Sequence, residues 1–493
     1  MSSCSRRQFL RSGTSVAAGF LGLQALSRSS GERIAGASER IAASDSQAGY
    51  GAVQADPAGV LDLPKGFSYR VISRAGSEMA DGFVVPGLAD GMAAFSDDAS
   101  GLTIVVRNHE ISPGTILSAF GRNNERLKKL DRDLVYDFGN GQTPGPGGTS
   151  TIVFDTRQQK VVREYLSLAG TIRNCAGGPT PWGSWISCEE TVIRKGFHPQ
   201  KNALLRAFGG GFTAEHDHGF NFEVPASVEP RLAEPVPLKA MGRFNHEAIA
   251  VDPASSIVYQ TEDRGDGAIY RFIPKTRVEG KAKLSDGGQL QALAIKGQPG
   301  RDMRNWDEKL PLIDVGQQFA VEWIDLDDVE APKDDLRYRA FESGAARFAR
   351  GEGMWYGDGS IYFACTSGGR EEIGQIWKYT PRSGAGNSAE GEPAEPASPG
   401  TLELFIEPND SRLIENADNL TVAPWNELFV CEDRGSKTAR IIGVTPDGQP
   451  FVFAACHLSS ELAGATFSPD GSTLFVNAQK SGLTFAVTGP WHV

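Results

Sequence analysis

The feature that most constrains the fold of this chain is a weak internal repeat. Each copy holds three short runs of β-branched and aromatic residues, separated by turns rich in Gly, Asp and Pro. The copies lie at 245–274, 350–381, 418–444 and 464–487, with weaker ones at 91–110 and 174–190. No long amphipathic helical pattern separates them. Self-similarity of this kind indicates an all-β fold, and the number of copies predicts a six-bladed β-propeller with loop insertions.

The spacing of the copies places the insertions and the domain. The chain has 493 residues, with 58 Gly and 28 Pro, which favours many tight turns. The segments 191–239 and 275–347 are longer than a turn requires, and we expect them to cap the active mouth or decorate the rim. Residues 57–493 are predicted to form a single propeller domain.

Acidic residues recur at two fixed places in the copies. They open the first strand at Glu247, Glu352 and Asp418, and they close the second strand at Glu110, Glu189, Glu190, Glu262, Asp263, Glu432 and Asp433. The start of one strand lies beside the end of the next in an antiparallel pair, so each copy gathers its acids at one end. In a propeller that end would face one mouth of the central channel.

Clustered carboxylates repel one another and are costly to bury, and bound cations relieve that cost. The pattern therefore predicts hard-ion sites with oxygen ligands, against the alternative of solvated acids in turns. A formal net charge of −12 suits cation binding and argues against a nucleic-acid partner.

Other residue types near the acids leave alternatives open. Cys188 precedes Glu189 and Glu190, so it is either a thiolate ligand for a softer transition metal or an inert buried residue, and Cys431 holds a matching place before Glu432. His109 and His246 each precede a glutamate and could be ligands, acid–base groups or core residues. Arg350 stands two residues before Glu352, as either a phosphate clamp or a structural ion pair.

The N-terminal segment predicts export. Arg6 and Arg7 precede a short apolar run at 16–26, which is typical of a twin-arginine signal, and we assign residues 1–56 to signal peptide and linker. The run is too short to span a bilayer, and no later segment resembles a membrane span. We therefore expect a periplasmic or extracellular protein, handled by the twin-arginine export machinery and monomeric. Five cysteines follow the signal, so at least one thiol stays unpaired within the chain.

Long motifs in the body resemble the PhoX-type alkaline phosphatases. They are residues 174–190, 244–263, 350–353 and 467–491, and the resemblance runs from about Leu61 to the C-terminus. It implies a six-bladed propeller that carries iron (Fe3+) and calcium on its axis and hydrolyses phosphate monoesters. The implied partner is a small-molecule phosphate ester.

The resemblance also implies roles for individual residues. The family's iron is held by a cysteine thiolate and glutamates, which maps onto Cys188 with Glu247 or Glu262 and Glu352. Calcium then falls to Glu189, Glu190, Asp263, Asp418 and Glu432. Arg350 resembles the family's phosphate-binding arginine, which makes Arg350, Cys188 and Glu352 the predicted catalytic set.

Two other classes of protein stay open at this point. One is a calcium-dependent lactonase or esterase on a propeller, which would need neither a cysteine ligand nor an axial arginine. The other is a propeller whose metals are structural and whose face binds a partner. The sequence has no Gly-x-Ser-x-Gly motif and no Gly-rich phosphate loop ahead of a helix. A phosphatase of this kind would therefore depend on clustered cations and Arg350 rather than on a serine nucleophile.

Overall fold

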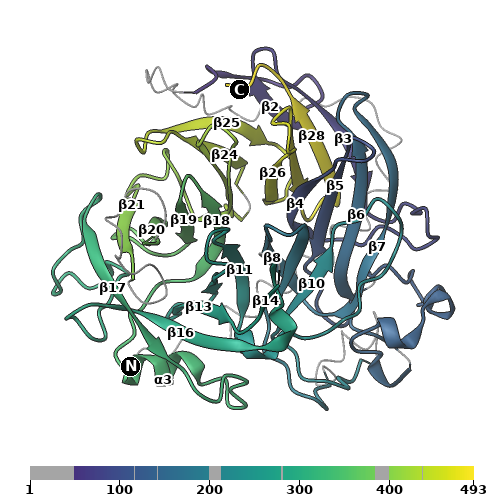
Figure 1. Cartoon of the computed structure of the whole chain (residues 1–493). Helices are drawn as coiled ribbons and strands as arrows, with labels where there is room; N and C mark the ends of the chain where they lie inside the picture. Colours follow the sequence, from purple (N-terminus) through teal and green to yellow (C-terminus); the bar gives the residue numbers. More distant parts are fainter. Residues whose placement is uncertain are drawn as a thin grey trace, which may run out of the picture. The chain divides into compact units, whose positions relative to one another are not determined.

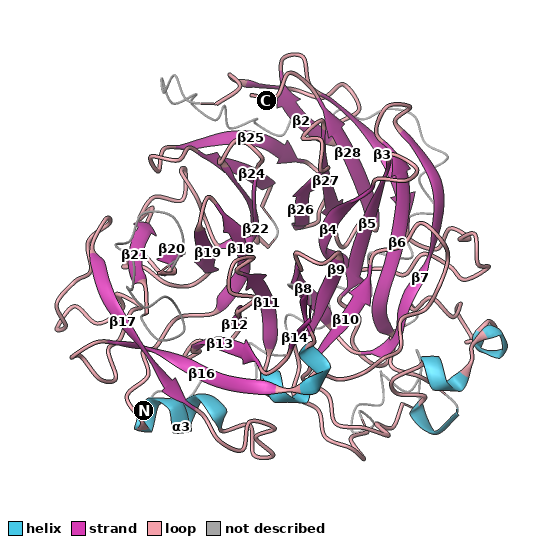
Figure 2. Ribbon diagram, in the orientation of Figure 1, coloured by secondary structure: helices cyan, strands magenta, loops and turns pink. Residues whose placement is uncertain are grey.

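The fold is almost entirely β-structure (Figures 1 and 2). In this computed structural model, residues 49–115, 117–141, 143–198, 212–278, 281–382, 399–435 and 437–492 are described. Within them lie one α-helix, α3 (Leu336–Glu342), and five short 3-10 helices. The latter are η1 (Leu127–Lys129), η2 (Arg132–Leu134), η3 (Gly139–Gly141), η4 (Lys239–Met241) and η5 (Leu284–Asp286).

Four antiparallel sheets are separate from one another. The first has the order β4 (Ala89–Asp97), β5 (Leu102–His109), β6 (Gly147–Asp155), β7 (Lys160–Thr171). The second is β8 (Asn174–Pro179), β9 (Ser184–Glu189), β10 (Asn221–Pro225). The third is β26 (Leu462–Phe467), β27 (Thr473–Ala478), β28 (Leu483–Thr488), β3 (Ser68–Arg74). The fourth is β22 (Ala417–Val422), β23 (Leu428–Glu432), β24 (Ala439–Val444), β25 (Pro450–Cys456), extended by β2 (Leu61–Pro64) and β1 (Val53–Gln54).

A nine-stranded sheet holds two further copies of the repeat. Its order is β11 (His246–Val251), β12 (Val258–Glu262), β13 (Ile269–Pro274), β16 (Gly288–Ile295), β17 (Gln318–Asp325), β21 (Thr401–Ile406), β20 (Gln375–Thr380), β19 (Ser360–Cys365), β18 (Gly351–Gly357). A small hairpin, β14 (Arg277–Val278) with β15 (Lys281–Ala282), stands apart.

The first strands of the repeats contact one another in a closed ring. The order of contact is β4, β8, β11, β18, β22, β26 and back to β4, and Figure 2 shows these six strands around a common centre. All six strands contribute residues to the lining of a narrow axial cavity, among them Gly91, Ala176, Ala248, Gly353, Asn419 and Gly464. Glycine is needed for this close approach, because a Cβ on Gly353 would lie 2.7 Å from the carbonyl oxygen of Asp418.

The propeller-like, all-β arrangement agrees with the sequence prediction, but six separate blades do not form. Apart from the β14–β15 hairpin, the described strands make four separate sheets and one nine-stranded sheet, because β17 pairs with both β16 and β21 and so joins two repeats. The segments interpreted as insertions also hold regular strands. β10 lies within 191–239, and β16 and β17 lie within 275–347, where they extend the sheets outward.

The two ends of the described chain meet at the same sheets. β3 pairs with β28, and β2 pairs with β25, which closes the ring between early and late residues. Tyr50 packs edge-on against Phe67 and Trp491, and β1 pairs with β2. The fold therefore includes Tyr50 and Val53–Gln54, residues that the sequence prediction gave to the linker. The twin-arginine segment lies outside the described residues.

Candidate metal and phosphate site

A β-bulge occurs at the same place in all six first strands. The ladder between first and second strands shifts between Ala89 and Met92, Asn174 and Gly177, His246 and Ile249, Gly351 and Met354, Ala417 and Leu420, and Ala463 and Thr466. In each case two residues of the first strand oppose one residue of the second. A bulge bends the strand and redirects a side chain, and it is a frequent neighbour of functional sites.

The first bulged residue is a potential metal ligand in five of the six strands. These residues are Asp90, Cys175, Glu247, Glu352 and Asp418, and Gly464 takes the place in β26. Each directly precedes a residue that lines the axial cavity. The bulges therefore bring four carboxylates and one thiol to the same end of the ring of inner strands.

Three groups of these side chains are close enough to share an ion. They are Asp90–Glu110–Cys175, Cys175–Glu190–Glu247 and Glu247–Glu352–Asp418, with the ligand atoms of each group within 4.8 Å of one another. Cys175 links the first group to the second, and Glu247 links the second to the third. We refer to these seven residues as the axial cluster.

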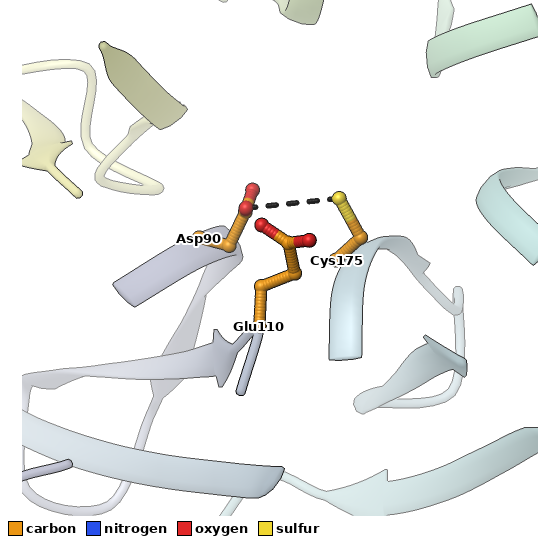
Figure 3. A group of neighbouring side chains, drawn as sticks. All are labelled: Asp90, Glu110 and Cys175. Atoms are coloured by element: carbon orange, nitrogen blue, oxygen red, sulfur yellow. Dashed lines mark hydrogen bonds between the residues drawn. The ribbon is translucent and has the colours of Figure 1, made fainter. Parts of the chain in front are cut away.

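Figure 3 shows the first group, in which the three side chains point toward one another. The Cys175 thiol donates to Oδ2 of Asp90 at 3.7 Å. Gln479, from the loop after β27, donates from Nε2 to Asp90 at 2.6 Å and to Glu110 at 3.0 Å. One oxygen of Asp90, Oδ1, is buried without a hydrogen-bond partner. A thiol beside two carboxylates is a donor set for a transition metal rather than for calcium alone.

Glu247 is the most exceptional residue of the axial cluster. It is completely buried, and neither carboxylate oxygen has a hydrogen-bond partner among the described residues. Burial first, and then the charge of Glu190, raises the pKa of Glu247 well above its usual value. Buried polar groups are nearly always hydrogen-bonded, so an orphaned carboxylate between two ligand groups fits a bound cation.

In other carboxylates of the axial cluster the charged form is also unfavourable. Burial is the main reason that the pKa of Glu190 rises to about 8 and that of Asp418 to about 7. Burial, followed by the neighbouring Asp263, raises the pKa of Glu352 well above its usual value. Since like charges raise one another's pKa, positive ions among these groups would restore their charged forms. The residues present therefore fit a set of bound cations.

Two arginines lie against the axial cluster. Arg350 donates from Nε to Oδ1 of Asp263 at 2.8 Å and from Nη2 to Glu352 at 2.7 Å. Arg173 contacts Glu110 through Nη2 at 2.6 Å and also donates to the Glu190 carboxylate. Burial alone would lower the pKa of each guanidinium, but the adjacent carboxylates raise it, so both arginines are charged.

The structure brings together part of the predicted site. Glu190, Glu247, Glu352 and Asp418 are in the axial cluster, and Asp263 joins them through Arg350. Cys188 is in none of the three groups, and Cys175 supplies the thiol instead. Cys188 is the single residue of β9 that lies opposite the bulge of β8. Cys431 of β23 lies in the equivalent place, opposite the bulge of β22. Cys188 packs among apolar residues such as Ile186 and Met241, although Glu247 adds to the effect of burial in raising its pKa.

Glu189, Glu262 and Glu432 are turned away from the axial cluster and have partners of their own. Glu189 accepts from Nδ1 of His218 at 2.7 Å and from the backbone amide of Gly219. Glu262 accepts from the Tyr270 hydroxyl at 2.8 Å and pairs with Arg337. Glu432 is held by two bonds from Arg440, at 2.6 and 2.7 Å. These carboxylates are satisfied without a metal.

The two candidate histidines are core residues. His109 is completely buried between the Gly87 carbonyl oxygen and the Ser150 hydroxyl, and burial lowers its pKa well below the usual value. His246 stacks on Phe244 and bonds to the Gly242 carbonyl oxygen, and burial lowers its pKa to about 3. Neither belongs to the axial cluster, and neither is positively charged at neutral pH.

Several site residues were absent from the sequence prediction. They are Asp90, Cys175, Arg173 and Gln479, and Glu110 was noted there only as a strand-ending acid. A signal for Cys175 existed, since it stands two residues after Arg173, as Glu352 stands two residues after Arg350. Asp90 similarly begins a weak repeat at the position that Glu247 holds in a strong one.

Comparison with known proteins identifies the family. The profile described as "Alkaline phosphatase PhoX" matches residues 48–482. The chain belongs to the PhoX alkaline phosphatase family. The resemblance stated from sequence motifs is thereby confirmed. Comparison with curated proteins gives no match.

One solved structure supports the fold. Pseudomonas fluorescens PhoX in complex with vanadate, described as a transition state analogue, superposes with a TM-score of 0.62 at 17% identity, covering 87% of this chain and 96% of that one. A gluconolactonase from Xanthomonas campestris aligns with 90% of this chain and 99% of its own, at 12% identity and a TM-score of 0.35. The first of these supports the propeller-like fold, and the second is too dissimilar to bear on it.

Two further predictions concern membranes and disulfides. Among the described residues, no helix has the length and apolar character needed to cross a membrane. Cys175, Cys188, Cys365, Cys431 and Cys456 are all buried and unpaired. Every thiol of the described chain is thus free, which leaves Cys175 available as a ligand.

Proposed function

We propose that this PhoX-family protein is a phosphatase that hydrolyses phosphate monoesters at the axial cluster, with iron and calcium as its metals. The observation that carries the proposal is Glu247, whose two buried and unpartnered oxygens lie between a group that contains the Cys175 thiol and a group made of carboxylates alone. Such a donor set suits a transition metal next to a harder ion.

The ligand assignment follows from the donor atoms. Cys175 would hold iron, either with Glu190 and Glu247 or with Asp90 and Glu110. The carboxylate group of Glu247, Glu352 and Asp418 offers only oxygen and suits calcium. Cys188 is replaced by Cys175 in this assignment, and Glu189, Glu262 and Glu432 become structural residues.

The chain's own residues would bind and orient the ester. Cations held by the axial cluster would neutralise charge on the phosphate oxygens. Arg350 uses Nε and Nη2 on Asp263 and Glu352, and within the described chain no hydrogen bond is assigned to its Nη1. That nitrogen is free to donate to a non-bridging oxygen, where it would stabilise charge that develops in the transition state. Asp263 and Glu352 fix the guanidinium in place beforehand.

The cellular setting is also proposed. The N-terminal twin arginine, outside the described residues, supports export by the twin-arginine pathway to the periplasm or beyond. That pathway carries folded proteins, so the metals could be loaded before export. We expect the exported protein to act as a monomer.

Elemental analysis, run beside p-nitrophenyl phosphate hydrolysis, tests the proposal. Protein exported by its own signal should contain iron and calcium, and a calcium chelator should abolish hydrolysis. Readdition of calcium should restore it. Calcium without iron, together with no hydrolysis, would contradict the proposal and favour a lactonase or a binding propeller.

A further inference from the structure

Arg173 and Arg350 occupy the same position of the repeat. This position lies two residues before the first bulged residue of the first strand. In five copies its backbone carbonyl oxygen accepts a hydrogen bond from a backbone amide at the end of the second strand. The acceptors are the carbonyl oxygens of Leu88, Arg173, Asn245, Arg350 and Asn416, and the donors are the amides of Glu110, Glu190, Asp263, Thr366 and Asp433. Only two of these five positions carry a cation. The arginines stand before β8 and β18, with β11 and its Glu247 between them in the ring.

The two arginines also share their detailed geometry. Both have a left-handed backbone, with φ of 49° at Arg173 and 53° at Arg350, as have Leu88 and Asn416 at the same position of two other repeats. Each uses Nε and Nη2 on residues at the mouth, since Arg173 donates from Nε to the Glu190 carbonyl oxygen at 3.0 Å and from Nη2 to the Glu110 and Glu190 carboxylates. In the described chain neither guanidinium has a hydrogen bond assigned to Nη1. The left-handed conformation therefore belongs to this position of the repeat, and the arginines are distinguished from the other residues there by their charge and their contacts.

We propose that Arg173 is a second phosphate-binding residue, which donates from Nη1 to the phosphoryl group beside the Glu190–Glu247 part of the axial cluster while Arg350 donates beside Glu352. The proposal rests on the phosphatase function proposed above and adds a residue to its substrate site. The phosphoryl group of a monoester carries two negative charges when fully ionised, and planar guanidinium groups match the geometry of its oxygens.

Exposure favours this role over that of a buried counter-ion. The Arg173 side chain is 34% exposed, whereas Arg440, which neutralises Glu432 inside a blade, is 3% exposed. Arg350 at the mouth is 41% exposed. A guanidinium that only balanced Glu110 and Glu190 would not need an accessible edge. The Arg173 side chain is therefore accessible to an anionic ligand.

The test uses four variants of the full-length exported protein, Arg173→Gln, Arg173→Lys, Arg350→Gln and Arg163→Gln. Arg163 is a matched control, because its side chain is also 34% exposed and paired with a glutamate, Glu229, outside the axial cluster. The measurements are iron and calcium content, the Kd of orthovanadate by calorimetry, and kcat and KM for p-nitrophenyl phosphate. We expect R173Q to keep its metals and to bind vanadate about tenfold more weakly, as expected for loss of one charge-assisted hydrogen bond.

The control and the conservative variant sharpen the result. R163Q should bind vanadate like the wild type. R173K should recover part of the affinity, because it keeps the charge but loses the fork geometry. Unchanged vanadate affinity in R173Q with its metals in place would overturn the inference, as would metal loss that fully accounts for the weaker binding. If wild-type protein neither binds vanadate nor hydrolyses the ester, the proposed function itself fails, which is a separate result.

Discussion

Acids at neighbouring positions of the same repeat have opposite fates in two regions of the molecule. In each of three repeats, one second-strand residue lies opposite the bulge, and the residue after it is a glutamate that faces the interior of its blade. These glutamates are Glu189, Glu262 and Glu432, and they pair with His218, Arg337 and Arg440 respectively. The next residue, Glu190, Asp263 or Asp433, lies at the mouth. Side chains alternate along a strand, so consecutive acids must point to opposite sides. An acidic pair in the sequence thus marks one structural carboxylate and one carboxylate of the mouth.

The two sets of acids differ in how much positive charge the protein places beside them. Inside the blades each acid has a protein cation or several donors, so no ion is needed. At the mouth, two arginines face a larger number of acids, and Glu247 has no partner in the described chain. A metal centre is indicated by carboxylates that the fold leaves without counter-charges, rather than by carboxylates alone.

The largest difference should appear between two variants in which Cys175 or Cys188 is replaced by serine. Cys175→Ser should lose iron and lower kcat/KM by at least about 100-fold, since the thiolate ligand is removed. Cys188→Ser should retain iron and most activity, because Cys188 occupies a packing position equivalent to that of Cys431. Metal analysis and ester hydrolysis of both variants check this. Iron loss from the Cys188 variant alone would reverse the assignment.

A second comparison concerns stability inside a blade. Glu432→Ala leaves the buried Arg440 without its carboxylate, and we expect unfolding free energy to fall by about 3–5 kcal/mol. Iron and calcium content of the folded protein should be unchanged. Urea denaturation and elemental analysis measure both quantities. Metal loss in a variant that remains folded would place Glu432 in the metal centre after all.

A third prediction uses pH. His218 lies completely buried between Glu189 and Asp137; burial alone would lower its pKa, but these carboxylates raise it to about 9. A raised pKa stabilises the fold fully below the unfolded value of about 6.5 and loses that effect as the pH rises through about 9. His218→Asn should therefore cost about 2–3 kcal/mol at pH 6 and much less at pH 10. Denaturation at both pH values tests it, and a cost independent of pH would contradict the charged state.

The smallest predicted effect on stability is that of replacing Glu247 in the metal-free protein. Glu247→Gln removes a carboxylate whose pKa is raised by burial, so metal-free protein at pH 8 should become more stable. The same variant should lose metals and activity. Glu262→Gln is the control, because Glu262 has Tyr270 and Arg337 as partners. Destabilisation of the metal-free Glu247 variant would mean that Glu247 has a protein partner.

Much of the fold could be predicted from the sequence because short strands and turns are local signals. The strands of all six repeats form where the pattern placed them. The joining of two repeats through β17 could not be predicted, since it depends on pairing between segments about 80 residues apart, as Gln318 with Glu403. Strands inside the supposed insertions were missed for the same reason.

The sequence predicted a metal site built from acidic residues, but it did not identify every ligand. The acids at strand ends indicated the mouth, and Glu190, Glu247, Glu352 and Asp418 are there. The bulges that aim the first-strand residues inward leave no local sequence signal, so Asp90 was missed and Cys188 was preferred to Cys175. The arginines that neutralise Glu262 and Glu432 come from other strands and loops, and no sequence pattern linked them to these acids.

Anomalous diffraction gives the most direct test of the axial cluster as a metal centre. Crystals of protein exported by its own signal would be measured above and below the iron absorption edge. We predict an anomalous peak within about 2.3–2.5 Å of the Cys175 sulfur, the distance expected for a metal–thiolate bond, with further density among Glu247, Glu352 and Asp418. A peak beside Cys188, or no peak near Cys175 in active protein, would contradict the account.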